Sequence, residues 1–215
     1  FKRCNFSLCV CYKLVSMVDL HIHQGDIIQI VGHSGSGKSS LFGIISGSYK
    51  VCYDLFLTNE KINCGFRDFR TGQIIEFQQN VGKSNIVESF RDMASTYINL
   101  PNDEELKKVL QIMKLYDWWT TEKFDFDTVV QNVSGGQKSR INIAAALTQL
   151  IRNRPKIILF DEITSDIDSS TSTEIWNNIF DEFSGSTILF VNHDKNVSFN
   201  KKLQVWNINN GIITH

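Results

Sequence analysis

A glycine-rich segment directly after an apolar run constrains the fold of this chain more than any other feature. Residues 32–39 read G-H-S-G-S-G-K-S and match the pattern G-x-x-x-x-G-K-[ST] at every fixed position. The apolar residues before them predict a buried strand, and residues 38–46 predict a helix. Glycines let the backbone curl with its N–H groups pointing inward, and a helix N-terminus adds partial positive charge. This unit therefore predicts a phosphate-binding loop at the edge of an α/β sheet.

The residue types in this loop suit a bound nucleoside triphosphate with its Mg²⁺ ion. The Lys38 ammonium is expected to reach the β- and γ-phosphates, and the Ser39 hydroxyl is expected to bind the metal. A glycine–serine turn without a ligand is the alternative, and the strand and helix on either side of the loop argue against it. The predicted ATP-binding residues are Gly32, His33, Ser34, Gly35, Ser36, Gly37, Lys38, Ser39 and Ser40.

Two acidic residues follow a second apolar run. Ile157–Phe160 predicts a strand, and Asp161 and Glu162 come at its carboxyl end, the edge where open α/β sheets bind ligands. Asp161 is suited to hold Mg²⁺, and Glu162 is suited to position and polarise an attacking water. Strands often end in acids, so the pair is informative only beside the phosphate loop.

The chain divides into three blocks that together predict one α/β domain. Short alternating strands open the chain, and strand–helix alternation returns after residue 140, which is typical of a parallel sheet covered on both faces. Between them, residues 83–140 predict helices, and the clearest begins at Asn102, where Glu105 completes a capping-box pattern. We expect a core of residues 1–82 and 141–215, with N-terminal antiparallel strands and a mostly parallel sheet, and an inserted helical subdomain of residues 83–140. The predicted strands are Asn5–Val10, Val18–Ile22, Ile27–Val31, Ile74–Phe77, Ile157–Phe160, Thr187–Val191 and a terminal hairpin of Leu203–Ile208 and Ile212–Ile213.

Composition and charge argue against several classes of protein. The chain is 42% hydrophobic and 21% charged, as in an ordinary globular protein, and its net charge of −1 gives no global field for nucleic acid or an anionic membrane. No stretch approaches the roughly 18 apolar residues of a membrane span, and no signal peptide is visible.

The cysteines lack zinc spacing and are expected to be buried free thiols. Because the chain begins at Phe1, close to a predicted strand, we expect it to be a piece of a longer polypeptide.

Residues 133–140, V-S-G-G-Q-K-S-R, resemble the signature of ABC-type ATPases, which is L-S-G-G-Q followed by a basic residue and arginine. Val133 replaces the usual leucine. A Ser-Gly-Gly turn that opens a helix, expected over Ile141–Leu150, is a second anion cradle. One domain rarely needs two such cradles. Two copies packed head-to-tail do, because each ATP then lies between the Lys38 loop of one copy and the signature turn of the other. The residues assigned to the partner's ATP are Ser134, Gly135, Gly136 and Gln137.

Further matches to the family follow in its chain order. Residues 161–168, D-E-I-T-S-D-I-D, are similar to the family's run D-E-A-T-S-A-L-D. Asp168 matches this dimer loop, whereas Asp166 departs from alanine where the loop contacts the other copy. His193 follows the predicted strand Thr187–Val191, as does the family's switch histidine, which contacts the γ-phosphate.

Two assignments leave alternatives open. The glutamine that touches Mg²⁺ and senses the transmembrane domain is assigned to Gln79, with Gln78 as the other register, and the aromatic residue that stacks on adenine is Tyr12 or Phe6. The catalytic residues that the resemblance implies are Glu162, His193 and Gln79, and the implied metal ligands are Ser39, Gln79 and Asp161.

The resemblance implies an ATPase that uses ATP and Mg²⁺ and powers transport, as the nucleotide-binding domain of an exporter at the cytoplasmic face of a membrane. The D-E-x-T-S run favours the exporter, as do residues 86–90, I-V-E-S-F, which resemble the exporter segment T-I-x-E-N-I. The implied partners are transmembrane domains, in the same chain or in a separate subunit, and a second nucleotide-binding domain, identical or related. Nucleic acid is not an expected partner.

Two other functions remain as alternatives. A soluble ABC-type ATPase that acts on nucleic acid or ribosomes would carry a long coiled coil between Lys38 and Ser134, or a second domain behind a charged linker, and neither is visible. A non-hydrolysing regulator would be expected to lose Lys38, Glu162 or His193, and all three are present.

Overall fold

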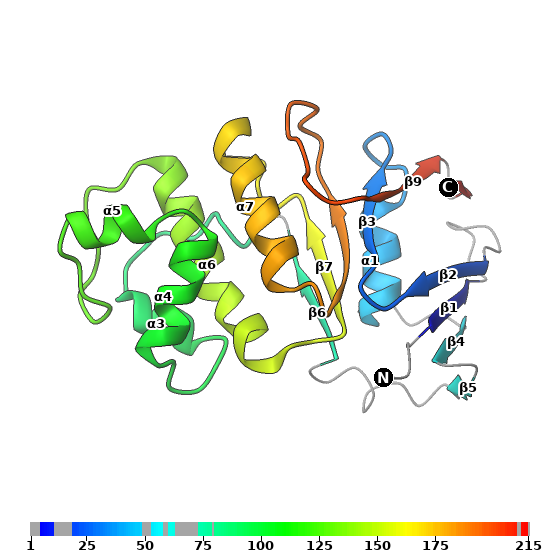
Figure 1. Cartoon of the computed structure of the whole chain (residues 1–215), viewed down its shortest axis with the longest axis horizontal. Coiled ribbons are helices and arrows are strands. Elements are labelled where there is room, and N and C mark those ends of the chain that lie inside the picture. The colour runs from blue at the N-terminus through cyan, green and yellow to red at the C-terminus, as the bar shows by residue number, and fades with distance from the viewer. Residues whose placement is uncertain are drawn as a thin grey trace.

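The computed structural model describes residues 5–10, 19–48, 53–57, 60–62, 73–78, 80–209 and 212–214, and for the first strands it describes the backbone alone. The described chain contains a four-stranded and a six-stranded sheet, with most helices gathered at the far end of the larger sheet (Figure 1). This mixed α/β architecture, with a mostly parallel sheet and antiparallel N-terminal strands, confirms the predicted fold class.

The six-stranded sheet carries the loops of interest. Its strand order is β10-β9-β3-β8-β7-β6, and every neighbouring pair is parallel except β9 with β10, which form the predicted terminal hairpin. The carboxyl ends of five parallel strands therefore meet at one edge. The strands are β3 (Ile27–Val31), β6 (Ile74–Phe77), β7 (Ile157–Asp161), β8 (Thr187–Val191), β9 (Gln204–Asn209) and β10 (Ile212–Thr214).

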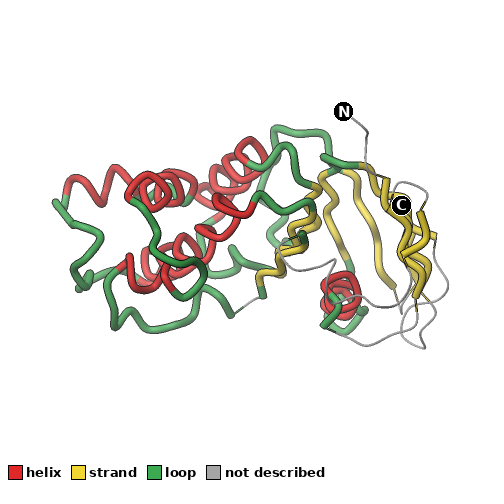
Figure 2. Tube along the Cα trace, turned by 90° about the horizontal axis from the view of Figure 1, so that it is seen from below, coloured by secondary structure: helices red, strands yellow, loops and turns green. Residues whose placement is uncertain are grey.

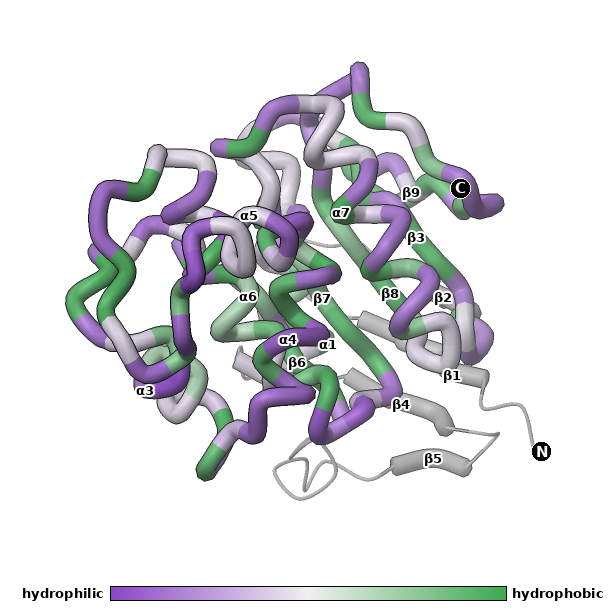
Figure 3. The backbone as a smooth tube through the Cα atoms, turned by 60° about the vertical axis from the view of Figure 1, so that its left-hand side comes forward, coloured by the Kyte–Doolittle hydropathy of each residue, from purple (hydrophilic) through white to green (hydrophobic). Residues whose placement is uncertain are grey.

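The two central strands are apolar on both faces because helices cover both. Side chains alternate along β7 and β8: Phe160 and Phe190 join the core on one face, and Leu159 and Leu189 join the core on the other. Helix α1 (Lys38–Ser46) packs on the second face, and Figure 2 shows it almost end-on beside the strands. Helix α7 (Ser169–Glu182) covers the first face with aromatic side chains. The resulting apolar centre appears green in Figure 3.

The four-stranded sheet is antiparallel and has the order β2-β1-β4-β5. Ile22 of β2 is buried in the same core as α1, which fixes this sheet against the larger one. Its strands are β1 (Asn5–Val10), β2 (Asp19–His23), β4 (Tyr53–Leu57) and β5 (Glu60–Ile62).

The remaining helices form the lobe beyond β6. They are α3 (Phe90–Ser95), α4 (Asp103–Ile112), α5 (Tyr116–Thr121) and α6 (Gly135–Asn153). The capping box predicted at Asn102 is confirmed, since Asn102 accepts from the Glu105 N–H and Glu105 accepts from the Asn102 N–H. The apolar stripe of α4 packs on α6.

The prediction that the helix after the signature starts at Ile141 was wrong. Helix α6 starts at Gly135 and runs without a break to Asn153. The capping box of Ser134 and Gln137 nucleates the helix ahead of the two glycines, and this outweighs their low helix propensity. Helix α6 therefore passes straight through residue 140, where we expected the helical subdomain to end.

Candidate functional site

Three loops converge at the carboxyl edge of the sheet, which is the upper edge in Figure 1. The phosphate loop follows β3, the acid pair ends β7, and the loop with His193 follows β8. Val191 at the end of β8 is in register with Ile30 of β3 on one side and Asp161 of β7 on the other. The strand order therefore brings together residues that are far apart in the sequence.

Glycines in the phosphate loop are required by close packing and by backbone geometry. A Cβ at Gly32 would lie 2.4 Å from the Ile208 carbonyl oxygen and 2.6 Å from the Ser36 hydroxyl oxygen, so no larger residue fits. Gly37, the residue before α1, has φ 109°, which L-residues rarely adopt. No side chain of a described residue caps the amides at this helix N-terminus. They are therefore available to an anion.

Lys38 is buried, and its ammonium lies inside the curl of this loop. The Nζ atom donates to the carbonyl oxygens of Gly32, at 3.0 Å, and His33, at 3.1 Å. The hydroxyl of Ser36 is also buried and finds no hydrogen-bond partner among the described residues. A buried hydroxyl and uncapped amides around a buried cation fit a phosphate group.

The loop residue Ser39 reaches the acid at the end of β7. The Ser39 hydroxyl donates to Asp161 Oδ2 at 2.7 Å, across 122 positions of sequence. A hydroxyl and a carboxylate beside a phosphate site are the oxygen ligands that Mg²⁺ uses in nucleotide-binding proteins, with phosphate oxygens and waters completing its shell. Within the described residues, no cluster of three or more His, Cys, Asp or Glu side chains forms a metal site. This small ligand set fits Mg²⁺ held together with a nucleotide.

Glu162 and His193 lie side by side at the same edge. His193 Nε2 and Glu162 Oε1 are 2.8 Å apart, and the Glu162 N–H donates to the Val191 carbonyl. Glu162 has φ 53°, a left-handed conformation that strains a non-glycine residue and turns it out of the strand direction. Its side chain is only 24% exposed, so its carboxylate is held beside the imidazole in a partly desolvated place.

Asp194 is a residue of this edge that the sequence reasoning did not select. Its carboxylate accepts from the Ser169 hydroxyl in the first turn of α7 and from the Asn196 N–H. The hydrogen bond from Ser169 lowers the pKa of Asp194 below its usual value. The contact connects the loop that contains His193 to the start of α7. In the sequence, the features that could have indicated it are the acid directly after His193 and the serine directly after the helix cap Asp168.

The signature turn begins α6 in the helical lobe. Ser134 caps the helix by accepting from the Gln137 N–H, and Gln137 Oε1 accepts from the Ser134 N–H. Gly135 and Gly136 lie in open space: a methyl group on either would meet no described heavy atom within 4 Å. Neither has a positive φ. Neither the backbone conformation nor the packing of the described residues therefore requires glycine at these two positions.

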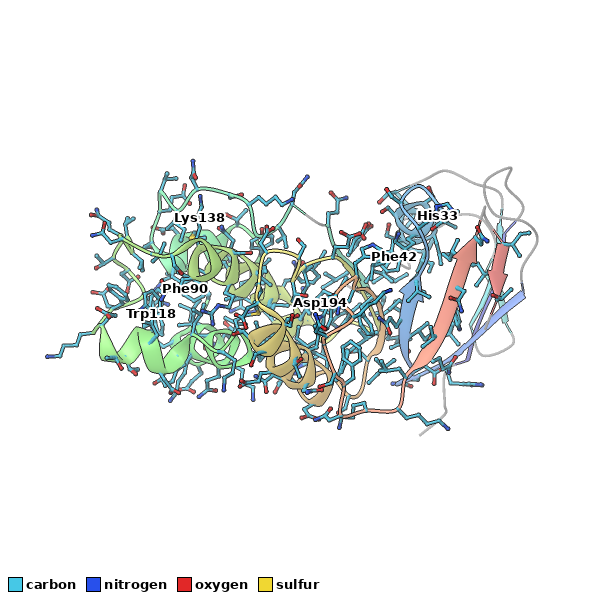
Figure 4. The ribbon with its side chains drawn as sticks, turned by 90° about the horizontal axis from the view of Figure 1, so that it is seen from above. His33, Phe42, Phe90, Trp118, Lys138 and Asp194 are labelled. Carbon is cyan, nitrogen blue, oxygen red and sulfur yellow. The ribbon has the colours of Figure 1, made fainter. Side chains whose placement is uncertain are left out.

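The signature turn does not meet the phosphate loop within one chain. Figure 4 looks down on the carboxyl edge, where His33 of the phosphate loop and Lys138 beside the signature turn lie at opposite ends, with Asp194 between them. Arg140 braces the turn by donating to the carbonyl oxygens of Gly136, Met113 and Lys114. Burial lowers the pKa of Arg140.

Asp168 begins helix α7 as its N-cap. It accepts from the Thr171 N–H at 2.9 Å. This hydrogen bond lowers the pKa of Asp168, and the positive charge of Arg140 adds to the effect. The predicted dimer loop therefore ends in a carboxylate whose charge is compensated within the chain.

Three predicted residues have no described side chain. Gln79 and Tyr12 lie outside the described residues, and Phe6 is described by its backbone in β1 only. Gln78, the alternative to Gln79, is exposed. The segment after it is anchored to α6, because Asn142 Nδ2 donates to the carbonyl oxygens of Gly82 and Ser84.

The fold and the site together define a phosphate-loop, nucleotide-binding α/β protein with an added helical lobe. Residues 15–165 match the family model of the ABC transporter. The methionine import ATP-binding protein MetN of Streptococcus pyogenes is 31% identical over 204 residues, which cover 86% of this chain and 54% of that protein. The macrolide export ATP-binding/permease protein MacB of Mannheimia succiniciproducens is 32% identical, over 84% of this chain and 28% of that protein.

A solved structure shares the fold. The structure of a bacterial Atm1-family ABC exporter with ATP bound has a TM-score of 0.78 at 18% identity, covering 100% of this chain and 39% of that one. The chain thus spans about half the length of MetN and less of the others. The family match over most of the chain shows that this protein belongs to the ABC transporter family. Within the described residues, no helix has the length and apolarity needed to cross a membrane.

Proposed function

We propose that this chain is an ATP-hydrolysing domain that powers transport across a membrane. The observation that carries the proposal is the convergence of Lys38, Ser39–Asp161 and Glu162–His193 at one sheet edge. Uncapped amides, a buried ammonium and a hydroxyl–carboxylate pair suit Mg-ATP, and the neighbouring acid–imidazole pair suits the attack of water.

Each group has a separate role in this proposal. The loop amides and Lys38 bind and orient the phosphates, and Ser39 and Asp161 hold Mg²⁺, which supplies charge neutralisation when bound. Glu162 accepts a hydrogen bond from the attacking water and polarises it. His193 pairs with Glu162 through Nε2 and so fixes that carboxylate, which leaves Nδ1 to contact the γ-phosphate. Gln79 is proposed as a further metal and water contact.

We propose that the active unit is a pair of such domains packed head-to-tail. The support is Gly135 and Gly136, because no described part of the chain packs against them and glycine in a first helical turn lowers helix stability. A partner that approaches closely explains them. In this arrangement Ser134, Gly135, Gly136 and Gln137 contact the ATP held by the other copy, and Asp168 lies in the loop between the two.

We propose further that residues 83–140 form a helical subdomain, distinct from a core of residues 1–82 and 141–215. Together with the Gln79 segment, this subdomain relays opening and closing of the pair to transmembrane partners at the cytoplasmic face. The exporter direction is also proposed, on the I-V-E-S-F segment of residues 86–90 and the D-E-x-T-S run. Relatives of both directions match the chain, so a transport assay with the transmembrane partners in oriented vesicles is the test of direction.

The central experiment is Glu162→Gln, which keeps the size of the side chain and removes its charge. We expect ATP binding to persist, phosphate release to fall by at least about a hundredfold, and an ATP-dependent dimer to accumulate. Glu174→Gln is the matched control, because Glu174 is an exposed residue of α7 that pairs with Lys114 and not with the residues of the proposed site. Phosphate release unchanged in Glu162→Gln would refute the assignment.

A further inference from the structure

The loop between Glu162 and Asp168 lies midway between the two glycine-rich turns. It leaves β7 at the carboxyl edge, and β7 lies between β3, which carries the phosphate loop, and β6, beyond which the helical lobe begins. Helix α6 leads back into β7 through a short connection, so its N-terminal signature turn lies at this same edge. Figure 1 shows the three features along the upper edge, with the start of α7 in the middle.

Symmetry then determines what this loop meets. If two copies pair so that each phosphate loop faces the other's signature turn, the two-fold axis passes halfway between the two turns. Residues near that axis lie opposite their own copies. The exposed side chains of the 162–168 loop, Ser165, Asp166 and Asp168, therefore come close to the same residues of the other copy.

The two acids of this loop differ in how their charges are compensated. Asp168 caps the positive end of α7 and lies in the field of Arg140. Asp166 is exposed and has no hydrogen bond or ion pair with any described residue. The loop thus presents one uncompensated negative charge at the position that symmetry places against an identical charge.

We propose that Asp166 is a pairing-specificity charge: it disfavours a dimer of two copies of this chain and favours a related ATP-binding domain with a neutral or basic residue at that position. The inference rests on the head-to-tail pairing proposed above. The physical reason is that two carboxylates facing each other repel, whereas a carboxylate facing a cation or a neutral side chain does not.

The first experiment compares self-pairing of matched variants in the Glu162→Gln background with Mg-ATP. Asp166→Ala is expected to strengthen the dimer about five- to tenfold by sedimentation, and the gain is expected to shrink between about 0.05 M and about 0.5 M salt. Glu104→Ala removes the same charge from an exposed position in the first turn of α4 and is expected to leave the dimer unchanged.

The second experiment exchanges the charge. Chains with Asp166 and chains with Asp166→Lys, one set labelled with ¹⁵N, are mixed with Mg-ATP and analysed by native mass spectrometry. We expect mixed dimers to exceed the share given by random pairing, because each like-charged pair is disfavoured and the opposite-charged pair is not.

The outcomes separate this inference from the function on which it rests. Dimers that form equally in every variant, with random mixing, overturn the role of Asp166 and leave the head-to-tail pair intact. ATP bound to the chains with no dimer in any variant, Asp166→Ala included, overturns the pairing itself and this inference with it.

Discussion

The two glycine-rich turns at the carboxyl edge look alike in sequence and are built in opposite ways. At the phosphate loop, Gly32 is packed against Ile208 and Ser36, and the amides that begin α1 are capped by no side chain of a described residue. At the signature turn, glycines lie in open space, and Ser134 and Gln137 cap α6 from both sides. The comparison teaches that packing within the chain accounts for Gly32, whereas no described part of the chain packs against Gly135 or Gly136, and this is why we propose a second chain there.

The largest expected effect comes from adding one methyl group to each turn. Gly32→Ala is expected to destabilise the fold by about 1–3 kcal/mol, because its Cβ would overlap the Ile208 carbonyl, and to abolish ATP binding. Gly136→Ala is expected to leave thermal stability equal or up to about 1 kcal/mol higher and to leave ATP binding by the single chain intact. Its phosphate release is nevertheless expected to fall by more than about tenfold.

Thermal unfolding, fluorescent ATP binding and phosphate release measure the three quantities. If Gly136→Ala hydrolyses ATP at the rate of the unaltered chain, the proposed difference between the two turns is wrong. No second chain would then approach Gly136 closely enough to require a glycine.

A smaller effect is expected from removing each helix cap. Ser134→Ala and Asn102→Ala both remove a capping-box side chain, so each is expected to cost about 1 kcal/mol of unfolding free energy. Only Ser134→Ala is expected to lower phosphate release, since Asn102 lies outside the proposed site. Denaturant titration combined with phosphate release tests this. Equal hydrolysis in both variants would mean that Ser134 only caps α6 and does not contact ATP.

The smallest expected effect is a difference between the two capping boxes in how their contribution to the unfolding free energy depends on pH. Hydrogen bonding to Arg152 lowers the pKa of Glu105, so its stabilisation is present above the unfolded pKa of roughly 4.3 and is lost as the pH falls through the lower folded value. The destabilisation caused by Glu105→Gln, less than about 1 kcal/mol, is therefore expected at pH 7 and should shrink in acid.

The box of Ser134 and Gln137 contains no titrating group. The destabilisation caused by Ser134→Ala is therefore expected to be the same at both pH values in thermal unfolding scans. If the destabilisation by Glu105→Gln persisted in acid, the stabilising contact between Arg152 and residue 105 would not depend on the charge of Glu105.

Local patterns explain why much of the fold was predictable. The strands of the parallel sheet are short apolar runs, and α4 carries its cap and its apolar stripe within a dozen residues, so neighbouring residues were sufficient to locate them. The start of α6 was missed because glycine propensity argued for a turn, whereas the reciprocal bonds of Ser134 and Gln137 decided for a helix. The bond between Asp194 and Ser169 was missed because it joins two loops that only the sheet brings together.

The sequence by itself determined that there is a phosphate loop, an acid pair after a strand and a Ser-Gly-Gly turn ahead of a helix, because each of these is a pattern of near neighbours. Only the tertiary structure decided which of them meet. The order of strands in the sheet brings Ser39 to Asp161 and His193 to Glu162. The signature turn begins α6 in the helical lobe beyond β6, away from the phosphate loop. The physical reason is that strand order depends on how distant segments share one buried core, and no short stretch of sequence contains that information.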